Sequence, residues 1–234
     1  MQQHKTVAIH QPNFLPWLGY FHKIWVSDVF VFLDDVEYTK NSFINRNKIK
    51  TPQGEQWLTV PVIYSGRSRQ RISDTRIHNP AKSMKKILGT VQMNYKKAAH
   101  YDDYFDEFRD IITKGHSHLT VLNIELNRWL CDKLDIRTQT ILSSDLNIRE
   151  DDATQRLIRI CGELGASGYV AGFGGEKYQG EEKFKEAGIA LMTSTYSPHE
   201  YPQLWGNYIP YMSALDALFN TGPYCKELVR RKNI

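Results

Sequence analysis

Short apolar segments alternate with amphipathic ones along the first part of the chain. Residues 7–9 form an apolar run that predicts a buried strand, a helix is predicted at about residues 16–26, and residues 29–33 are rich in β-branched and aromatic side chains. The order strand, helix, strand is the unit from which parallel sheets are built, with a right-handed connection. We therefore predict a parallel pair formed by the first two strands.

The pattern changes twice in the middle of the chain. Residues 41–54 alternate polar and apolar positions up to a Pro-Gln-Gly turn, and residues 56–62 follow as a strand, which predicts a β-hairpin. Three later segments carry apolar residues at three- and four-residue spacing, which is typical of helices: 83–95, 102–114 and 119–134. We predict a helical subdomain at about residues 80–135.

Alternating strands and helices return after this insert. A strand is predicted at residues 138–142, an amphipathic helix at 151–164 and a further strand at 168–171. We therefore predict the α/β class: a parallel sheet with a helical insert and a β-hairpin, in a single domain that spans residues 1–234.

Cysteine content and the lengths of the apolar segments indicate the cellular environment of the protein. The three cysteines, Cys131, Cys161 and Cys225, are far apart and odd in number, which argues against a disulfide framework or a zinc site. No apolar stretch approaches the roughly 20 residues of a membrane span. These features predict a soluble, cytoplasmic protein with reduced thiols.

The net charge of +4 suits an anionic small substrate. Basic residues cluster at positions 67–76 and 230–232, where a solvated loop and a frayed terminus explain them. They form no continuous stripe, so we expect no nucleic-acid partner. The oligomeric state stays open.

The end of the first strand is the strongest candidate site. Pro12 cannot extend a sheet ladder, so the chain leaves the sheet just after His10, and Pro16 has the fixed φ of a first helical turn. Ligands of open α/β sheets bind at such carboxyl strand ends, where a helix N-terminus adds N–H donors. The candidate binding and catalytic residues of this segment are His10, Gln11, Pro12, Asn13, Trp17, Gly19, Tyr20 and Lys23.

Two further strand ends and the hairpin add candidates. Asp34 and Asp35 follow the second strand and can hold Mg²⁺, orient a ribose or cap a turn. In the hairpin, Asn45 and Arg46 offer donors, and a guanidinium binds a carboxylate or phosphate bidentately. The strand at 168–171 delivers a glycine-rich turn that can approach a phosphate closely, with the candidates Gly172, Gly174, Lys177 and Tyr178.

The last predicted helix carries two polar residues on one face. Asp216 and Asn220 are four residues apart, beside a loop rich in aromatic residues. We interpret them as anchors of that loop.

The motifs His10-Gln11-Pro12, Leu15-Pro16-Trp17, Gly19-Tyr20 and Lys23 resemble the WbqC-like family. With the Asn45-Arg46 hairpin, the turn at 172–178 and the tail at 210–220, the resemblance covers essentially the whole chain. It implies a function in bacterial O-antigen and lipopolysaccharide biosynthesis, and a glycine transferase role has been suggested for the family.

The segment that leads from the first strand to His10 is also similar, more distantly, to the His-x-Gly-His region of the nucleotidylyltransferase superfamily, which includes pantothenate synthetase. This similarity implies a Rossmann-like sheet and contacts between His10 and ATP phosphates. The chain departs from the pattern because it has no second histidine at the expected place, although His22 follows in the helix. It also lacks a Lys-Met-Ser-Lys-Ser loop, for which Lys177 is a candidate substitute.

Together, the residues and both resemblances predict an acyl or aminoacyl transferase, with glycyl as one candidate group, or an ATP-dependent carboxylate–amine ligase that acts on a nucleotide-linked amino sugar. His10, Lys23 and Arg46 are the expected catalytic residues, and ATP and Mg²⁺ the expected cofactors. The partners are then a nucleotide-sugar and a small carboxylate or amino acid. Two alternatives remain: an acyltransferase that uses a pre-activated donor, with His10 as general base, and a non-catalytic nucleotide-sugar-binding protein.

Overall fold

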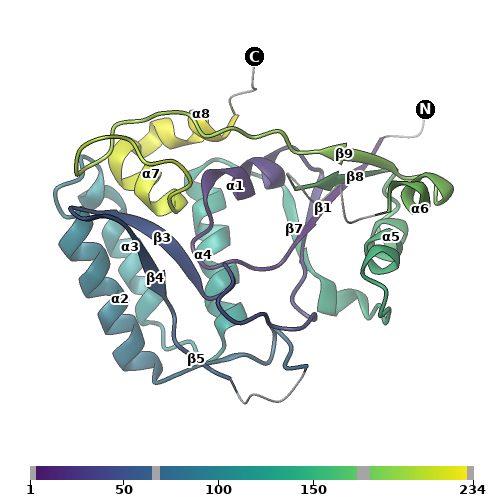
Figure 1. Ribbon diagram of the computed structural model, residues 1–234, viewed down its shortest axis with the longest axis horizontal. Coiled ribbons are helices and arrows are strands. Elements are labelled where there is room, and N and C mark those ends of the chain that lie inside the picture. The colour runs from purple at the N-terminus through teal and green to yellow at the C-terminus, as the bar shows by residue number, and fades with distance from the viewer. Residues whose placement is uncertain (1–3, 65–68, 173–179, 231–234) are drawn as a thin grey trace.

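A computed structural model describes residues 4–64, 69–172 and 180–230 of the chain. Within these residues a parallel sheet of five strands has the order β7-β2-β1-β8-β9 (Figure 1). The strands are β1 (Thr6–His10), β2 (Val29–Phe32), β7 (Gln139–Leu142), β8 (Gly168–Ala171) and β9 (Ala190–Thr193). This Rossmann-like sheet confirms the predicted α/β class. Strand β9 was not predicted.

The order in which the chain adds strands to this sheet reverses at the central strand β1. The chain adds β2 and then β7 on one side of β1, and afterwards β8 and β9 on the other side. The gap between the ends of β1 and β8 is therefore the topological switch point, where α/β sheets commonly bind ligands.

Helices cover both faces of the sheet (Figure 1). On one face, Ala8, Phe30 and Phe32 pack with helix α1 (Leu18–Trp25), α4 (Leu119–Lys133), α7 (Ala214–Thr221) and α8 (Cys225–Arg230). On the other face, Val7 and Ile9 pack with α5 (Ala153–Glu163) and α6 (Glu181–Glu186). Since neighbouring side chains of a strand point to opposite faces, His10 shares the α1 face with Ala8.

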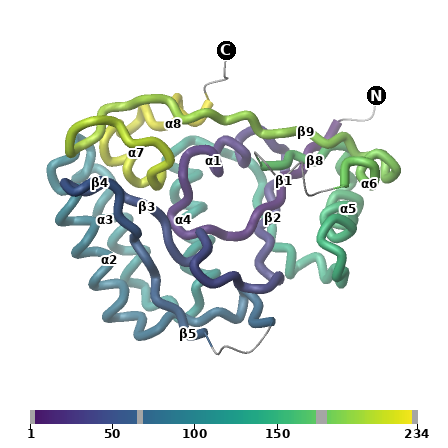
Figure 2. Tube along the Cα trace, viewed as in Figure 1, coloured from purple at the N-terminus to yellow at the C-terminus, as the bar shows by residue number. Residues whose placement is uncertain are grey.

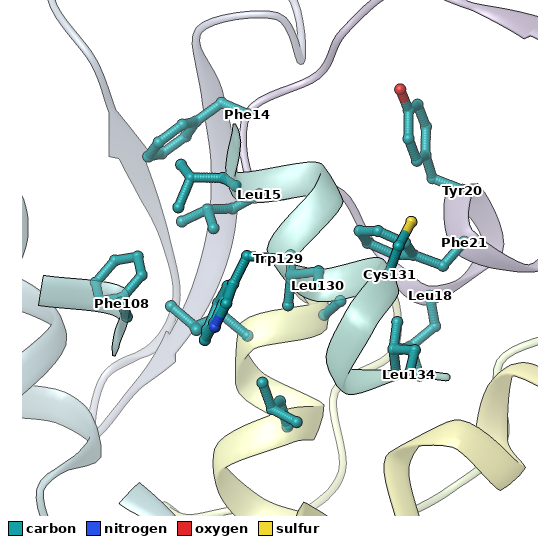
Figure 3. Packing of buried hydrophobic residues seen from close by; sticks show 14 of the residues in the cluster. Phe14, Leu15, Leu18, Tyr20, Phe21, Phe108, Trp129, Leu130, Cys131 and Leu134 are labelled. Carbon is teal, nitrogen blue, oxygen red and sulfur yellow. The ribbon is translucent and has the colours of Figure 1, made fainter. Parts of the chain in front are cut away.

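The predicted helical insert is present as α2 (Pro80–Tyr95), α3 (Tyr101–Thr113) and α4. The path of the tube in Figure 2 takes the chain from these helices back to the sheet through β7. Close up, Leu18 and Phe21 of α1 lie against Cys131 and Leu134 at the end of α4 (Figure 3). The insert thus packs onto the helix that follows β1.

The predicted hairpin is formed by β3 (Arg46–Thr51) and β4 (Gly54–Thr59), which pair in antiparallel register. A second small ladder joins β5 (Val62–Ile63) and β6 (Arg76–Ile77). Short 3₁₀ helices, η1 (Ser143–Leu146) and η3 (Gly222–Tyr224), follow β7 and α7. Among the residues described, no helix combines the length and apolarity needed to cross a membrane.

Candidate functional site

A cavity of about 310 Å³ opens at the switch point, on the face of the sheet that carries α1. It brings together six of the residues predicted from the sequence: His10, Trp17, Gly19, Tyr20, Lys23 and Gly172. The segment after β9 completes the wall with Ser194 and Tyr196. We name this space the His10 cavity.

His10 enters the cavity from the last position of β1. Its imidazole meets the ring of Tyr20 edge-on, with 5.0 Å between the ring centroids. The Tyr20 hydroxyl donates to the carbonyl of Gln11 over 3.0 Å, so α1 is tied to the chain directly after the strand. Burial, and secondly the nearby Lys23 ammonium, hold the pKa of His10 well below its usual 6.5. His10 is therefore neutral at physiological pH.

Lys23 is almost completely buried at 4% exposure. Its Nζ donates to the carbonyl of Ile9 over 2.8 Å, and within the described part of the chain no carboxylate forms an ion pair with it. Burial lowers its pKa from 10.5 to about 7. A lysine with a pKa near 7 exists in both charged and neutral forms. Together with a neutral histidine in the same cavity, it is typical of a functional site.

Aromatic rings form the outer wall of the His10 cavity. The Trp17 indole lies 5.5 Å from the ring of Tyr196 and 5.2 Å from that of Tyr211, measured between centroids. Trp17 folds back over Gly19 so closely that a Cβ at residue 19 would lie 2.3 Å from the indole. Gly19 is therefore required for the position of this wall.

We expect Gly19→Ala to displace the Trp17 ring and lower the affinity of the cavity for its ligand about tenfold, while changing the unfolding free energy by less than about 1 kcal/mol. Stability should change little because alanine favours the helix and only a side chain must move. Isothermal titration calorimetry and thermal unfolding measure the two effects, with Gly89→Ala, in open space on α2, as control. Unchanged affinity would contradict this role.

The loop between β1 and α1 is held by asparagines that the sequence analysis missed. Asn123 of α4 donates to the carbonyls of Pro12, over 2.8 Å, and of Ile44, over 2.7 Å. Asn127, one turn later, donates to the carbonyl of Asn13 over 2.8 Å. We name these two residues the asparagine clamp. The detectable signal was two asparagines at i and i+4 on the helix face that also carries Leu119, Leu122, Leu126 and Leu130, because buried amides need partners.

A third buried asparagine, Asn47 of β3, holds a strained piece of backbone in the same loop. Leu15 has a φ of 43°, which is uncommon for a residue with a side chain, and its carbonyl accepts a hydrogen bond from Asn47 over 2.6 Å. Helix α1 accordingly begins at Leu18, after Trp17, and not at Pro16 as predicted. Pro12 and Asn13 are buried in this loop and do not line the His10 cavity.

The structure does not bring the hairpin residues to the His10 cavity. The Arg46 guanidinium lies 4.3 Å from the centre of the Trp57 ring, and its Nη2 donates to the carbonyl of Asn41 over 2.6 Å. Asn45 donates to the carbonyl of Val60 over 3.0 Å. Both side chains thus contact the hairpin and the segments beside it, and neither lines the His10 cavity.

The two acids after β2 also have internal partners. The Asp34 carboxylate accepts hydrogen bonds from the hydroxyl and backbone N–H of Ser144, over 2.9 and 3.0 Å, and from the Ser143 hydroxyl over 3.1 Å. Asp35 forms an ion pair with Arg156 of α5. Among the described residues no group of three or more His, Cys, Asp or Glu side chains is arranged to hold a metal. Asp34 and Asp35 thus join η1 and α5 to β2.

Of the glycine-rich turn, Gly172 lines the His10 cavity, whereas Gly174, Lys177 and Tyr178 lie outside the described residues. His22, the possible counterpart of a second motif histidine, does not line this cavity. Its Nδ1 lies 2.7 Å from the carbonyl of Val229 and thereby joins α1 to α8.

Asp216 anchors the aromatic loop, as predicted. Its buried carboxylate accepts hydrogen bonds from the hydroxyls of Tyr95 and Tyr201, both over 2.7 Å, and from the Gln203 amide over 2.9 Å. Asn220 receives the backbone N–H of Leu204 over 3.2 Å. Desolvation raises the pKa of Asp216. The anchored segment leads into Tyr211 of the cavity wall.

Fold and site together define an α/β protein with a Rossmann-like sheet and a candidate ligand cavity where its strand order reverses. The chain belongs to the WbqC-like protein family, whose model matches residues 11–227. It is similar to a protein of Mycobacterium tuberculosis (strain ATCC 25618 / H37Rv) described as uncharacterized protein Rv1507c. The two are 39% identical over 230 residues, which cover 97% of this chain and 98% of that protein. No solved structure matches the chain significantly.

Proposed function

We propose that the protein is an enzyme that activates a small carboxylate with ATP and passes the acyl group to the amine of a nucleotide-linked amino sugar, in the synthesis of a surface polysaccharide. Where the carboxylate is an amino acid, a glycyl group is the smallest acyl group that could be transferred. The observation that carries this proposal is the pair formed by His10 and the buried Lys23 in a cavity at the switch point.

The His10 cavity has the donors that nucleotide phosphates require. Lys23 can supply a positive charge, and a neutral imidazole retains one ring N–H to donate. Helix α1 begins at the cavity and its N-cap, Trp17, makes no side-chain capping bond, so the positive end of the helix dipole faces the cavity uncapped by a side chain. The Trp17 and Tyr211 rings offer an apolar surface for a base or sugar ring.

The chemistry has two steps. A carboxylate oxygen attacks the α-phosphorus of ATP, and the bond to the β-phosphate breaks to release pyrophosphate. The amine of the sugar then attacks the acyl carbon, AMP leaves, and the amine proton passes to a base. Charge grows on phosphate oxygens in the first step, where Lys23 and His10 would stabilise it. Mg²⁺ would accompany the ATP phosphates and not Asp34 or Asp35.

Release of pyrophosphate tests this proposal. We expect turnover when the protein is incubated with ATP, Mg²⁺ and a panel of small acids that includes glycine. His10→Gln should lower the rate about 10²- to 10⁴-fold and leave thermal unfolding nearly unchanged. His78→Gln, at an exposed position, is the matched control. Absence of ATP binding together with absence of pyrophosphate across the panel would refute the proposal.

A second function is favoured by the protonation state of His10. A histidine that burial keeps neutral can accept a proton from the sugar amine, which suits an acyltransferase that uses an already activated donor. Product formed from an acyl thioester or aminoacyl-tRNA without ATP would favour this function. Tight nucleotide-sugar binding that survives His10→Gln, with no product from any donor, would instead indicate a binding protein.

A further inference from the structure

A second, larger cavity lies at the carboxyl ends of β2 and β7. Its volume is about 760 Å³, and its walls come from the segment after β2, from η1 and from α5. The lining is predominantly polar and includes three arginines: Arg71, Arg149 and Arg156. We name it the arginine cavity. Of the residues predicted from the sequence as a site, it contains Asp35.

The two cavities lie along the same edge of the sheet. The backbone N–H of Leu33 donates to the carbonyl of His10 over 2.8 Å, so the ends of β1 and β2 are joined directly beside the His10 cavity. Asp35 follows only two residues later, which at about 3.3 Å per residue places its backbone within roughly 7 Å of Leu33. The two cavities therefore open at neighbouring strand ends, the His10 cavity on the α1 face of the sheet and the arginine cavity toward α5.

The ion pairs of the arginine cavity leave two of its three arginines without an acidic partner among the described residues. Asp35 is paired with Arg156, and Glu150 with Arg159 over 3.3 Å. Arg71 and Arg149 are exposed, and no described carboxylate forms an ion pair with either. These two guanidinium groups can take a phosphate or diphosphate bidentately.

The remaining lining suits hydroxyl and amino groups. Asp151 has no ion-pair partner among the described residues, and Asn147 and Ser144 supply neutral donors and acceptors. The Arg156 Nε is buried and has no hydrogen-bond partner within the described ranges. A buried donor without a partner is costly unless a ligand or water meets it. A lining of separate cationic, anionic and neutral groups matches a phosphorylated sugar better than a simple anion.

We propose that the arginine cavity is the binding site of the acceptor, a nucleotide-diphosphate amino sugar. Arg71 and Arg149 hold the diphosphate, while Asp151 and Asn147 face the hydroxyl and amino groups of the sugar. This assignment rests on the proposed two-substrate reaction, in which the His10 cavity takes ATP and the carboxylate. The amine then reaches the activated acyl group across the ends of β1 and β2.

Calorimetric titration of two ligands into matched variants tests the assignment. The probes are ATP and a panel of amino sugars linked to UDP, dTDP and GDP. In Arg71→Gln/Arg149→Gln, the dissociation constant of the bound sugar nucleotide should rise tenfold or more, about the effect of losing charge-assisted hydrogen bonds, whereas that of ATP stays unchanged. Arg76→Gln, an exposed arginine that does not line the arginine cavity, should change neither constant.

Three outcomes would overturn the assignment: no binding of any sugar nucleotide, unchanged sugar-nucleotide affinity in the double variant, or an equal loss of ATP affinity. A different result would refute the proposed function alone. If ATP does not bind the wild-type protein but the arginine variant still has a lower affinity for the sugar nucleotide, the acceptor site is supported and ATP-dependent activation is refuted.

Discussion

Replacing Lys23 by methionine should make the protein more stable and at the same time abolish ATP binding. Lys23 is buried without an acidic partner among the described residues, and its pKa is lowered to about 7. Maintaining this side chain in the fold at pH 7 therefore costs up to ~5 kcal/mol, since each pKa unit corresponds to about 1.4 kcal/mol. Methionine fills nearly the same volume without a charge.

The net gain is smaller because the carbonyl of Ile9 loses its donor, which costs about 1–3 kcal/mol. We expect Lys23→Met to raise the unfolding free energy by about 2 kcal/mol at pH 7, and the Tm by about 4–8 °C. Lys82→Met, at an exposed position on α2, should change the Tm little and leave ATP binding intact.

The sign of the pH dependence follows from the lowered pKa. Between about pH 7 and 10.5 the unfolded chain holds a proton on Lys23 that the folded protein lacks, so wild-type stability rises with pH over this range. The advantage of Lys23→Met should be largest at pH 7 and shrink toward pH 10. Denaturant unfolding at several pH values measures this difference.

Ligand affinity should depend on pH in the opposite direction. Phosphates favour the charged ammonium, so ATP binding should weaken as the pH rises above 7 and should take up protons, seen as buffer-dependent binding enthalpies. A destabilised Lys23→Met variant, or one that still binds ATP with wild-type affinity, would contradict the role of Lys23.

Asn123→Asp should destabilise the protein by about 3 kcal/mol or more. Asn123 is fully buried, and its amide donates to the carbonyls of Pro12 and Ile44. A carboxylate of nearly the same shape removes both hydrogen bonds and places a buried negative charge against two carbonyl oxygens. Because these contacts hold the loop between His10 and α1, ligand affinity at the His10 cavity should fall as well.

Chemical denaturation at pH 5 and pH 8 checks this expectation. Burial raises the pKa of the introduced carboxyl, and its protonation at lower pH restores one donor, so the loss of stability should be smaller at pH 5. Gln92→Glu, the same exchange at an exposed position of α2, should stay within about 0.5 kcal/mol. A loss below about 1 kcal/mol at pH 8 would show that the asparagine clamp is not required.

If both expectations hold, Lys23 and the asparagine clamp affect stability in opposite directions at the same site. Lys23 is a buried amine retained in the interior at the expense of stability, whereas the clamp contributes stability by holding the loop between His10 and α1. Stabilising substitutions that abolish function are expected where a buried group serves a ligand and not the fold.

Local pattern was sufficient to predict most of the elements. The apolar run before His10, the alternation around the Pro-Gln-Gly turn and the helical spacing between residues 80 and 135 correspond to β1, the hairpin and α2–α4. Turns and periodicities act over a few residues, so they remain visible in one sequence. The grouping of His10, Gly19, Tyr20 and Lys23 was predictable for the same reason, since these residues lie within one strand–helix connection.

What each polar residue contacts depended on segments far apart in the chain. Asp34 accepts hydrogen bonds from Ser143 and Ser144 because β7 lies beside β2. The order of strands around β1, the burial of Lys23 and the asparagine clamp likewise arise from packing between distant elements. The sequence by itself determined the elements and the carboxyl strand end where a site forms. The tertiary structure decided which side chains share that site, because burial and partner choice are set by contacts that no local pattern encodes.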